Sequence, residues 1–316
     1  LYNAIYAPAV AYGADHVSSV NLGSIKKGGK ADINVTLKNI TGSSVTYNAK
    51  LYLTTDGVEA GKNGKYFSLE PVTLGAIDLG SFTVEAGKST AVQTTVDVSQ
   101  YTFPEAPNGN YLDGFIVFSS DTEVEISIPV TGFVGDWANL AVLEDDIYTL
   151  EKAGKRPVHY SPYGTFTHLG SAVGKYAVVL GEVEIDEQNS TYTDEHLAIS
   201  PNGDKVNDYV RFFGTFLRGF KDMTMKVKDA KTGDVIYTSK EDKEGVKNYH
   251  GDAIVKDEDI WEKVSTGSDW EWNGKNGDTD APDGKYVLEV SVSPLIDGAD
   301  LQTKSYNFTV DRVKPE

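Results

Sequence analysis

Apolar and polar residues alternate with a period of two along most of this chain. In the clearest run the apolar residues occupy every second position, at Val45, Tyr47, Ala49, Leu51 and Leu53. Successive side chains of a β-strand point to opposite faces, so this alternation is typical of a strand with one buried and one solvated face. Glycine-containing turn signals such as Thr41-Gly42-Ser43-Ser44 lie between the runs. The pattern therefore predicts antiparallel strands.

The same alternation recurs up to residue 135. Its apolar positions are Ile33, Val35 and Leu37, then Phe82 and Val84, then Val92, Val96 and Val98, and then Val124, Ile126, Ile128 and Val130. About seven short strands at this spacing indicate a sandwich of two sheets. The run from Tyr111 to Phe118 is apolar on both faces over most of its length, which predicts a central strand that is covered on both sides.

A long connection is predicted after Trp137, where the alternation stops. Residues 138–170 mix glycines, prolines and charges, including the acidic cluster Glu144, Asp145 and Asp146, and indicate a solvated linker with one helical turn. Strand-like runs return at Val210 and continue to Val310. The sequence therefore predicts an all-β chain of two tandem β-sandwich domains, fibronectin type III-like or immunoglobulin-like. Their expected bounds are residues 1–145 and 146–316, the second with a long N-terminal connection.

Composition narrows the classes of partner. The 316 residues suit about two domains, each large enough to bury a core without disulfides, and the chain has no cysteine. The absence of cysteine leaves the compartment open. A net charge of −18, from 29 basic and 47 acidic residues, would repel nucleic acid and anionic membranes and favours cations or basic partners. No apolar run approaches the roughly 20 residues of a membrane-spanning helix. Because the chain opens at Leu1 without methionine, we expect a piece of a larger protein.

A candidate cation site lies just before the strand that starts near Val210. Oxygen-bearing groups recur at every second residue, with side chains at Ser200, Asn202, Asp204 and Asp208 and the backbone carbonyl at Val206. Calcium takes six to eight oxygen ligands, and alternate residues of a tight loop can turn inward together, so the spacing predicts a calcium site. Lys205 occupies the place where a helical calcium loop has glycine. The alternative interpretation, an Asn-Gly turn with solvated acids, stays open.

A second and weaker calcium candidate follows the two tryptophans of the C-terminal half. Its oxygens come from Asn276, Asp278 and Asp280, which repeat the spacing of every second residue. Trp270 and Trp272 share one strand face, so at least one of them is expected in the core, with ligand stacking as the alternative.

The sequence offers no arrangement typical of catalysis. The five histidines are scattered through turn-like surroundings, where surface or capping roles are expected: His16, His159, His168, His196 and His250. No pair has the helical spacing of a zinc site, and no serine lies in a Gly-x-Ser-x-Gly elbow. Gly87-Lys88-Ser89 lacks the leading glycine of a phosphate loop, because that position is Phe82. The chain is therefore predicted to have no enzymatic activity of its own.

Several motifs resemble one family of surface proteins. They are Ser200-Pro201-Asn202-Gly203-Asp204, Asn207-Asp208-Tyr209-Val210, Val246-Lys247-Asn248-Tyr249, Trp272-Asn273-Gly274-Lys275 and Asp283-Gly284-Lys285-Tyr286, with Gly132-Phe133-Val134-Gly135-Asp136-Trp137 in the first half. Together they resemble the fibronectin-type-III-like modules of the streptococcal and lactococcal cell-envelope subtilisin-like serine proteases, the group of the complement-cleaving peptidases and the lactocepins. The resemblance covers nearly the whole chain.

This resemblance implies a non-catalytic stalk of an exported, cell-wall-anchored serine protease of a Gram-positive bacterium, in some relatives a virulence factor. Such modules brace the protease domain of the same chain, and some help to dock large protein substrates or touch host proteins. Lys205 departs from the family, which usually has glycine there, and the absence of Arg-Gly-Asp removes the sequence support for integrin binding. The alternative is an adhesin-like or pilus-like module that binds a host protein or glycan directly.

Calcium should raise the thermal stability of this chain if Asp204 and Asp208 are ligands. For a dissociation constant of ~0.1 mM, ~1 mM calcium would stabilise the domain by roughly 1.4 kcal/mol. The measurement is thermal unfolding with calcium and with a chelator. An unchanged midpoint, or an equal loss on replacing Asp97, would count against these two residues as ligands.

Overall fold

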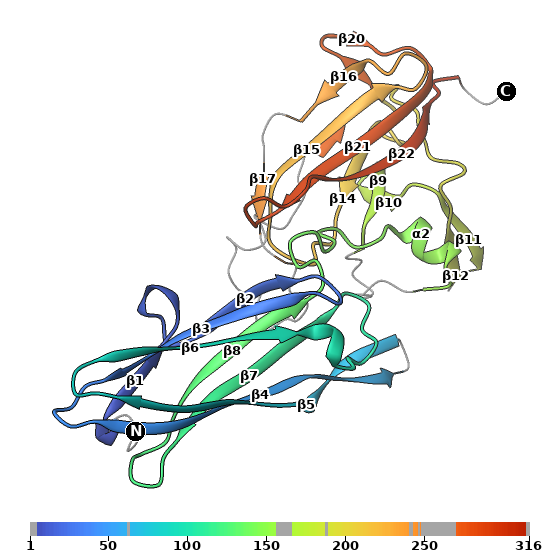
Figure 1. Ribbon diagram of the computed structural model, residues 1–316. Coiled ribbons are helices and arrows are strands. Elements are labelled where there is room, and N and C mark those ends of the chain that lie inside the picture. Colours follow the sequence, from blue (N-terminus) through green and yellow to red (C-terminus); the bar gives the residue numbers. More distant parts are fainter. Residues whose placement is uncertain are drawn as a thin grey trace. The chain divides into compact units, whose positions relative to one another are not determined.

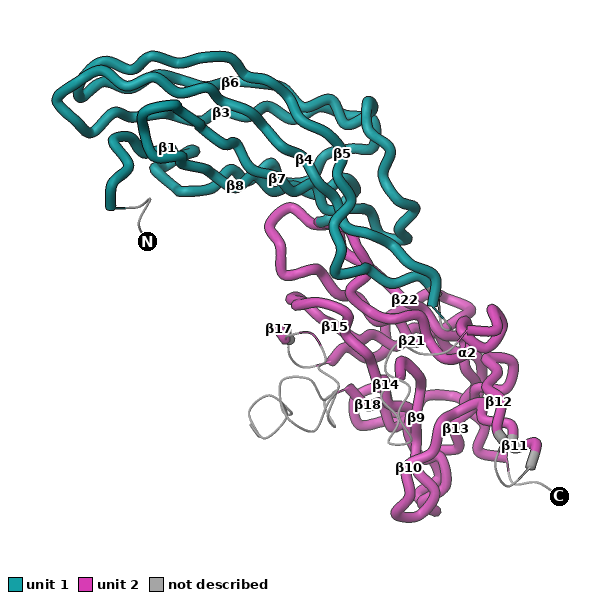
Figure 2. The backbone as a smooth tube through the Cα atoms, turned by 90° about the horizontal axis from the view of Figure 1, so that it is seen from below, with its two compact units in different colours: residues 1–137 teal, residues 138–316 magenta. Residues whose placement is uncertain are grey.

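The structure is a computed structural model of the chain. It describes residues 5–61, 64–155, 166–186, 189–239, 243–245, 247 and 270–313. The chain divides into two compact units, Leu1–Trp137 (unit 1) and Ala138–Glu316 (unit 2), shown in Figure 2. No helix among the described residues is long and apolar enough to cross a membrane.

Unit 1 is built from eight strands and two short 3₁₀ turns (Figure 1). They are β1 (Ala9–Tyr12), the turn Ala14–His16, β2 (Val20–Ile25), β3 (Lys30–Asn39), β4 (Val45–Gly61), β5 (Gly64–Val84), β6 (Ser89–Asp97), the turn Val98–Gln100, β7 (Asn110–Ser119) and β8 (Ile126–Val134). A five-stranded sheet has the order β2-β8-β7-β4-β5, and a three-stranded sheet has the order β1-β3-β6.

The core of unit 1 is formed by alternate residues of the two sheets. On β4 the inward residues Tyr47, Leu51 and Leu53 are fully buried, whereas their neighbours are exposed. β3 and β6 contribute Ile33, Leu37 and other buried aliphatic residues to the same cluster. Burial of such side chains stabilises by about 1.5–3 kcal/mol each, so the period-two pattern is the main source of stability here. The predicted β-sandwich is confirmed.

The outer face of the five-stranded sheet is open at β7. Leu112, Ile116 and Phe118 of β7 are buried, but Phe115 points to the other face and is 53% exposed. Phe115 lies opposite Tyr52 of β4 and Pro129 of β8 in the sheet register. The expectation that this strand is covered on both faces is wrong, because no described element packs over this row of apolar side chains.

Unit 2 contains one short helix and shorter strands. They are α2 (Ile147–Lys152), β9 (His168–Val173), β10 (Tyr176–Val179), β11 (Glu182–Asp186), β12 (Asn189–Tyr192), β13 (Ala198–Ile199), β14 (Val210–Phe213), β15 (Phe220–Asp229), β16 (Val235–Thr238), β17 (Lys243–Gly245), β18 (Glu271–Trp272), β19 (Lys275–Asn276), β20 (Thr279–Asp280), β21 (Gly284–Pro294) and β22 (Gln302–Val310).

Two larger sheets enclose the core of unit 2. One has the order β10-β9-β14-β18, and the other has the order β13-β22-β21-β15-β16 with β17 beside β15.

Trp270 and Trp272 are 2% and 1% exposed, so both belong to the core, as expected for at least one of them. Trp272 packs against Tyr286 and Phe308, and the burial of both tryptophans leaves no ring face for a ligand. The all-β fold class is therefore confirmed for the described residues, and α2 is the helical turn that the sequence predicts in the connection after Trp137.

The acidic cluster before α2 is not a solvated linker. Glu144 is only 4% exposed. Nζ of Lys304 donates a hydrogen bond of 3.2 Å to Asp145, and the side chain of Asp146 accepts one of 2.8 Å from the Thr149 N–H at the start of α2. Each acid therefore has a structural position, two of them with a defined partner, and the segment packs onto unit 2.

The two units divide between Trp137 and Ala138, whereas the sequence predicts a boundary at residue 145. The difference follows from contacts of the intervening residues with β22. Oε1 of Gln302 accepts a hydrogen bond of 2.9 Å from the Val142 N–H, and Nε2 of Gln302 donates to the Leu140 carbonyl at the same distance. The side chain of Asn139 accepts from the Asp300 N–H. These bonds attach residues 139–142 to unit 2.

A neutral histidine is part of the core of unit 2. His168 on β9 is 7% exposed, and its ring stacks on Phe213 with centroids 4.7 Å apart. Its Nδ1 lies 2.7 Å from the Phe166 carbonyl oxygen. Burial lowers the pKa of His168 to about 4, partly offset by this hydrogen bond. The expected surface or capping role is therefore wrong for His168.

Acid should destabilise unit 2 through His168. The unfolded chain takes up the proton below pH ~6.5 while the folded chain resists it, so stability is complete above ~6.5 and falls as the pH drops towards about 4, by roughly 3 kcal/mol. The measurement is urea unfolding between these pH values. His168→Phe should flatten this part of the profile, and replacement of the exposed His196 should not. Identical slopes for wild type and His168→Phe would contradict the assignment.

Candidate functional site

The loop Ser200–Asp208 is organised around the carboxylate of Asp208. Its Oδ1 accepts hydrogen bonds from the N–H groups of Asn202 and Gly203, at 3.0 and 2.8 Å, and its Oδ2 accepts one from Lys205 at 2.8 Å. Two further side chains accept hydrogen bonds from the same stretch of backbone. Oδ1 of Asn202 accepts one from the Asp204 N–H, and Oδ1 of Asp204 accepts one from the Val206 N–H, both at 2.9 Å. The alternate oxygens do converge, but on backbone donors.

Left-handed backbone angles bring these donors together. Gly203, Lys205 and Asn207 have φ angles of 84°, 71° and 53°. Successive N–H groups turn to one side in such a backbone and form a concave anion site, which the Asp208 carboxylate fills. Position 205 therefore does need the conformation that glycine adopts freely, and Lys205 adopts it at an energetic cost of roughly 1–2 kcal/mol.

The β9–β10 turn holds one side of this loop. The Gly174 N–H donates to the Lys205 carbonyl at 2.7 Å, and the Asn207 N–H donates to the Ala172 carbonyl at 2.8 Å. Val173 and Val206 form an isolated β-bridge. The loop is therefore a fixed part of the fold.

The oxygens of the loop suit calcium less well than the spacing suggests. Three N–H groups already occupy the two oxygens of Asp208, and a cation on those oxygens would have to compete with them. Within the described ranges no three histidine, aspartate or glutamate side chains group closely enough to hold a metal. One buried oxygen, Oδ1 of Asn207, has no hydrogen-bond partner among the described residues. Calcium binding by Ser200, Asn202, Asp204, Val206 and Asp208 stays a prediction, but Asp208 has a structural role without it.

The second candidate set lies on the β19–β20 hairpin. Asn276, Asp278 and Asp280 are all exposed there, around Gly277 with a φ of 62°. The Thr279 hydroxyl donates to the Asn276 carbonyl at 2.9 Å. The spacing of these oxygens is accounted for by a tight turn, and calcium at this hairpin also stays a prediction.

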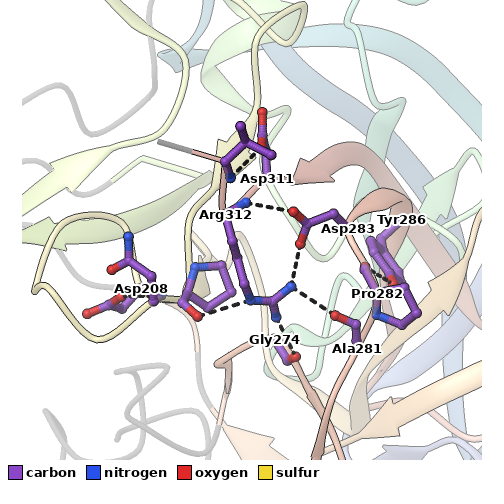
Figure 3. Close-up of polar contacts among 11 residues, drawn as sticks. Asp208, Gly274, Ala281, Pro282, Asp283, Tyr286, Asp311 and Arg312 are labelled. Carbon is purple, nitrogen blue, oxygen red and sulfur yellow. Dashed lines mark hydrogen bonds and ion pairs between the residues drawn. The ribbon is translucent and has the colours of Figure 1, made fainter. Parts of the chain in front are cut away.

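Arg312 joins this part of unit 2 into one junction (Figure 3). Its Nε donates to the Pro201 carbonyl at 3.1 Å, Nη1 to Ala281 at 2.9 Å and Nη2 to Gly274 at 3.1 Å. Its Nη1 also forms an ion pair with Asp283. One planar guanidinium thus binds three carbonyls from two separate segments, the loop at Pro201 and the hairpin between Gly274 and Ala281. A lysine ammonium could not do this because its donors lie at one point.

The partner carboxylate is fixed at the same place. The Arg312 N–H donates to Oδ2 of Asp283 at 2.9 Å. This backbone hydrogen bond, followed by the hydrogen bond and charge of the guanidinium, lowers the pKa of Asp283. The pair therefore stays ionised under neutral conditions. Arg312 lies two residues after the end of β22, so the end of the last strand is tied to the loop before β14.

Gly274 permits the close approach at this junction. It has a φ of 77°, and a Cβ at this position would lie 2.5 Å from Cγ of Pro201 and 3.0 Å from Nη2 of Arg312. Only glycine fits both the angle and the space. Beside it, Nε1 of Trp272 donates to the Lys275 carbonyl at 2.7 Å, which orients the hairpin that follows.

The junction accounts for three of the motifs that carry the family resemblance. Pro201, Gly274 and Asp283 come from the Ser-Pro-Asn-Gly-Asp, Trp-Asn-Gly-Lys and Asp-Gly-Lys-Tyr stretches, and Arg312 contacts all three. Sequence reasoning missed Arg312, because a single arginine after a strand has no local pattern. Of the stretch 246–249 only Lys247 is described, and His159 and His250 also lie outside the described residues.

Comparison with protein families defines the class of unit 1. Residues 20–131 match the model of the Fn3-like domain family, and this segment runs from β2 to within β8. This part of unit 1 is therefore similar to Fn3-like domains, in agreement with its two-sheet architecture.

The relatives extend the likeness over both units. The C5a peptidase of Streptococcus pyogenes serotype M3 is 29% identical over 353 aligned residues, which cover 95% of this chain and 29% of the relative. The C5a peptidase of serotype M1 is 30% identical with the same coverage. The expected resemblance to the streptococcal cell-envelope proteases is thus confirmed. The chain spans about 29% of the length of these relatives.

Solved structures add little. Spo0M, a sporulation control protein of Bacillus subtilis, is 14% identical and has a TM-score of 0.31 over 42% of this chain and 50% of its own.

Loss of the Arg312 guanidinium should destabilise unit 2. Arg312→Lys removes two or three hydrogen bonds to carbonyls that are shielded from water, and should lower the free energy of unfolding by about 2–3 kcal/mol. Lys221→Ala, which breaks an ion pair with the fully exposed Asp297, should cost no more than about 0.5 kcal/mol. Chemical unfolding of the three proteins provides the comparison. Equal losses in both variants would show that the junction contributes no more than a surface pair.

Proposed function

We propose that this chain is an accessory region of a surface serine peptidase and has no catalytic residues of its own. The observation that carries the proposal is the likeness to the C5a peptidases, which takes in 95% of this chain but only 29% of each relative. The greater part of those enzymes therefore has no counterpart here. In this interpretation the peptidase domain lies elsewhere in the same longer protein, which is exported and attached to the cell wall.

The arrangement of the described residues supports a non-catalytic role. The buried His168 is packed between Phe166 and Phe213 with its Nδ1 on a carbonyl oxygen, so it is not positioned to activate a nucleophile. In unit 2 the acids of the candidate loop are occupied by backbone N–H groups. These groups stabilise loops and leave little capacity for acid–base chemistry.

Bracing and substrate docking are the two tasks that such a region can perform. The Arg312 junction and the Asp208 loop tie neighbouring segments of unit 2 together, which suits a rigid support that keeps a peptidase domain in a fixed position. A charge of −18 on 316 residues favours the approach of basic polypeptides over acidic ones. A protein substrate with basic segments would be held near the peptidase domain by this field, and the attraction would weaken with salt.

The test separates protein substrates from short peptides. In the longer natural protein, deletion of residues 1–137 should raise KM for a protein substrate, with C5a as the probe, by at least about tenfold. The kcat for a short peptide that reaches only the catalytic domain should stay unchanged. The isolated 316-residue chain should cleave neither substrate.

Three outcomes would overturn the proposal. Cleavage by the isolated chain would make it an enzyme in its own right. A flanking sequence without a peptidase domain would show that the longer protein is not a peptidase. Tight binding of the isolated chain to a host matrix protein or glycan would instead favour the adhesin-like alternative.

A further inference from the structure

We propose that the free edge of β6 in unit 1 binds an extended polypeptide segment, uncharged except for an acidic residue at one end, which adds to the sheet as a fourth strand. This inference concerns unit 1 alone and holds whether or not the chain belongs to a peptidase. It rests on the pairing of β6, on its sequence and on its contrast with the other sheet edges of the molecule.

β6 ends the three-stranded sheet with one side of its backbone unpaired. It pairs with β3 over nine residues, from Lys30 opposite Asp97 to Lys38 opposite Ser89, with no register shift. No other described strand pairs with it, and no hydrogen bond from elsewhere in the described chain reaches the backbone of residues 89–97. Neighbouring residues of a strand direct their N–H and C=O groups to opposite sides. About half of the backbone groups of β6 therefore face away from β3.

The sequence of β6 lacks the usual protection of an edge. Residues 89–96 carry no charge and no proline. Their outward side chains are small or uncharged and exposed, at Ser89, Ala91, Gln93 and Thr95. Thr90 and Thr94 point inward and stay only half-buried, as expected beside an open edge. Proteins generally protect such edges with lysine, proline, bulges or short strands, because an open edge recruits further strands.

Other edges in the described chain carry that protection. β5 contains Pro71 and three register shifts against β4. β2 has a register shift around Gly23, and β1 is only four residues long. In unit 2, β22 pairs with two residues of β13, and its Gln302 side chain holds the segment before α2. The regular and uncharged edge of β6 is therefore a departure from the pattern of the rest of the chain.

The dimensions of the edge favour a single extended segment over a second folded copy. Nine residues give a strip about 30 Å long, and neighbouring strands lie about 5 Å apart. The outward side chains beside it form no apolar patch. A stable dimer of folded proteins buries about 800 Å² on each partner, which one such strip does not supply. An extended peptide needs only main-chain hydrogen bonds and small side chains at alternate positions.

Charge fixes one end of the bound segment. Lys38 and Lys88 are both exposed at the end of the strand pair that begins at Ser89. At the other end Asp97 is already engaged by Lys30 and Ser99. An acidic residue of the partner would therefore lie beside the two lysines. The partner class is a flexible polypeptide segment with β-branched or small residues and one terminal acid.

The first test uses amide hydrogen exchange in the whole 316-residue chain, read residue by residue by NMR. The probe is a synthetic peptide of alternating threonine and valine with aspartate at one end. Alternate amides of β6 should exchange quickly in the free chain and slow by at least about tenfold with millimolar peptide. Amides of β7, which is paired on both sides, serve as the control and should not change. Uniform protection along β6 in the free chain, or no slowing with peptide, would overturn the proposal.

A pair of proline variants provides the second test. Gln93→Pro and Thr94→Pro remove neighbouring N–H groups, of which one faces β3 and the other faces the open edge. The register places the Thr94 N–H towards β3 and the Gln93 N–H at the open edge. Gln93→Pro, the edge variant, should therefore keep its melting temperature and lose peptide binding by at least about tenfold, while Thr94→Pro should lose stability. Wild-type binding in both variants would contradict the inference. A monomer–dimer equilibrium in sedimentation that the edge variant abolishes would show a second copy as the occupant and would overturn the choice of an extended segment.

Discussion

The loop end of unit 2 depends on one guanidinium group. Backbone carbonyls in turns have no strand or helix partner, and a carbonyl shielded from water without a donor costs roughly 1–3 kcal/mol. Arg312 donates to the carbonyls of Pro201, Gly274 and Ala281 and pairs with Asp283, so one side chain ties the end of the chain after β22 to the loop before β14 and to the hairpin that runs from Gly274 to Ala281. The glycine at 274 and the proline at 201 are then consequences of this closeness. They form the space that the arginine needs.

The alternating pattern predicted the strands of unit 1 well, because a strand with one buried face has an apolar residue at every second position of its sequence. Tyr47, Leu51 and Leu53 show this, as every second residue on β4 enters the core. Hydrogen-bond and ion-pair partners that are distant in the sequence produce no such pattern. Glu144, Asp145 and Asp146 have the composition of a linker, yet Lys304 and the start of α2 give the last two fixed positions. The prediction that Phe115 is covered was wrong for the opposite reason, since an apolar residue at an exposed position is indistinguishable in sequence from a buried one.

The candidate cation loop shows a more basic ambiguity. Oxygens at alternate residues of a tight turn converge whether the group at the centre is a cation or a set of backbone donors. In this chain the backbone at Gly203, Lys205 and Asn207 turns its N–H groups inward, and the Asp208 carboxylate accepts them. The spacing of the side chains is the same for a loop that holds a cation and for a loop filled by its own carboxylate, and only the backbone φ angles distinguish the two. Sequence could locate the loop and its acids but could not decide between these two centres.

The two units offer a partner different kinds of groups. In the loop Ser200–Asp208 the Asp208 carboxylate already accepts three backbone N–H groups, so a partner that bound to it would have to replace existing hydrogen bonds and would gain little. The one buried side-chain oxygen of this loop without a partner among the described residues is Oδ1 of Asn207. The outer backbone groups of β6 in unit 1 pair with no described strand, so a strand that added there would replace only water. The regular edge of β6 therefore suits strand addition better than the Asp208 loop does, although the loop carries the more conspicuous sequence signal.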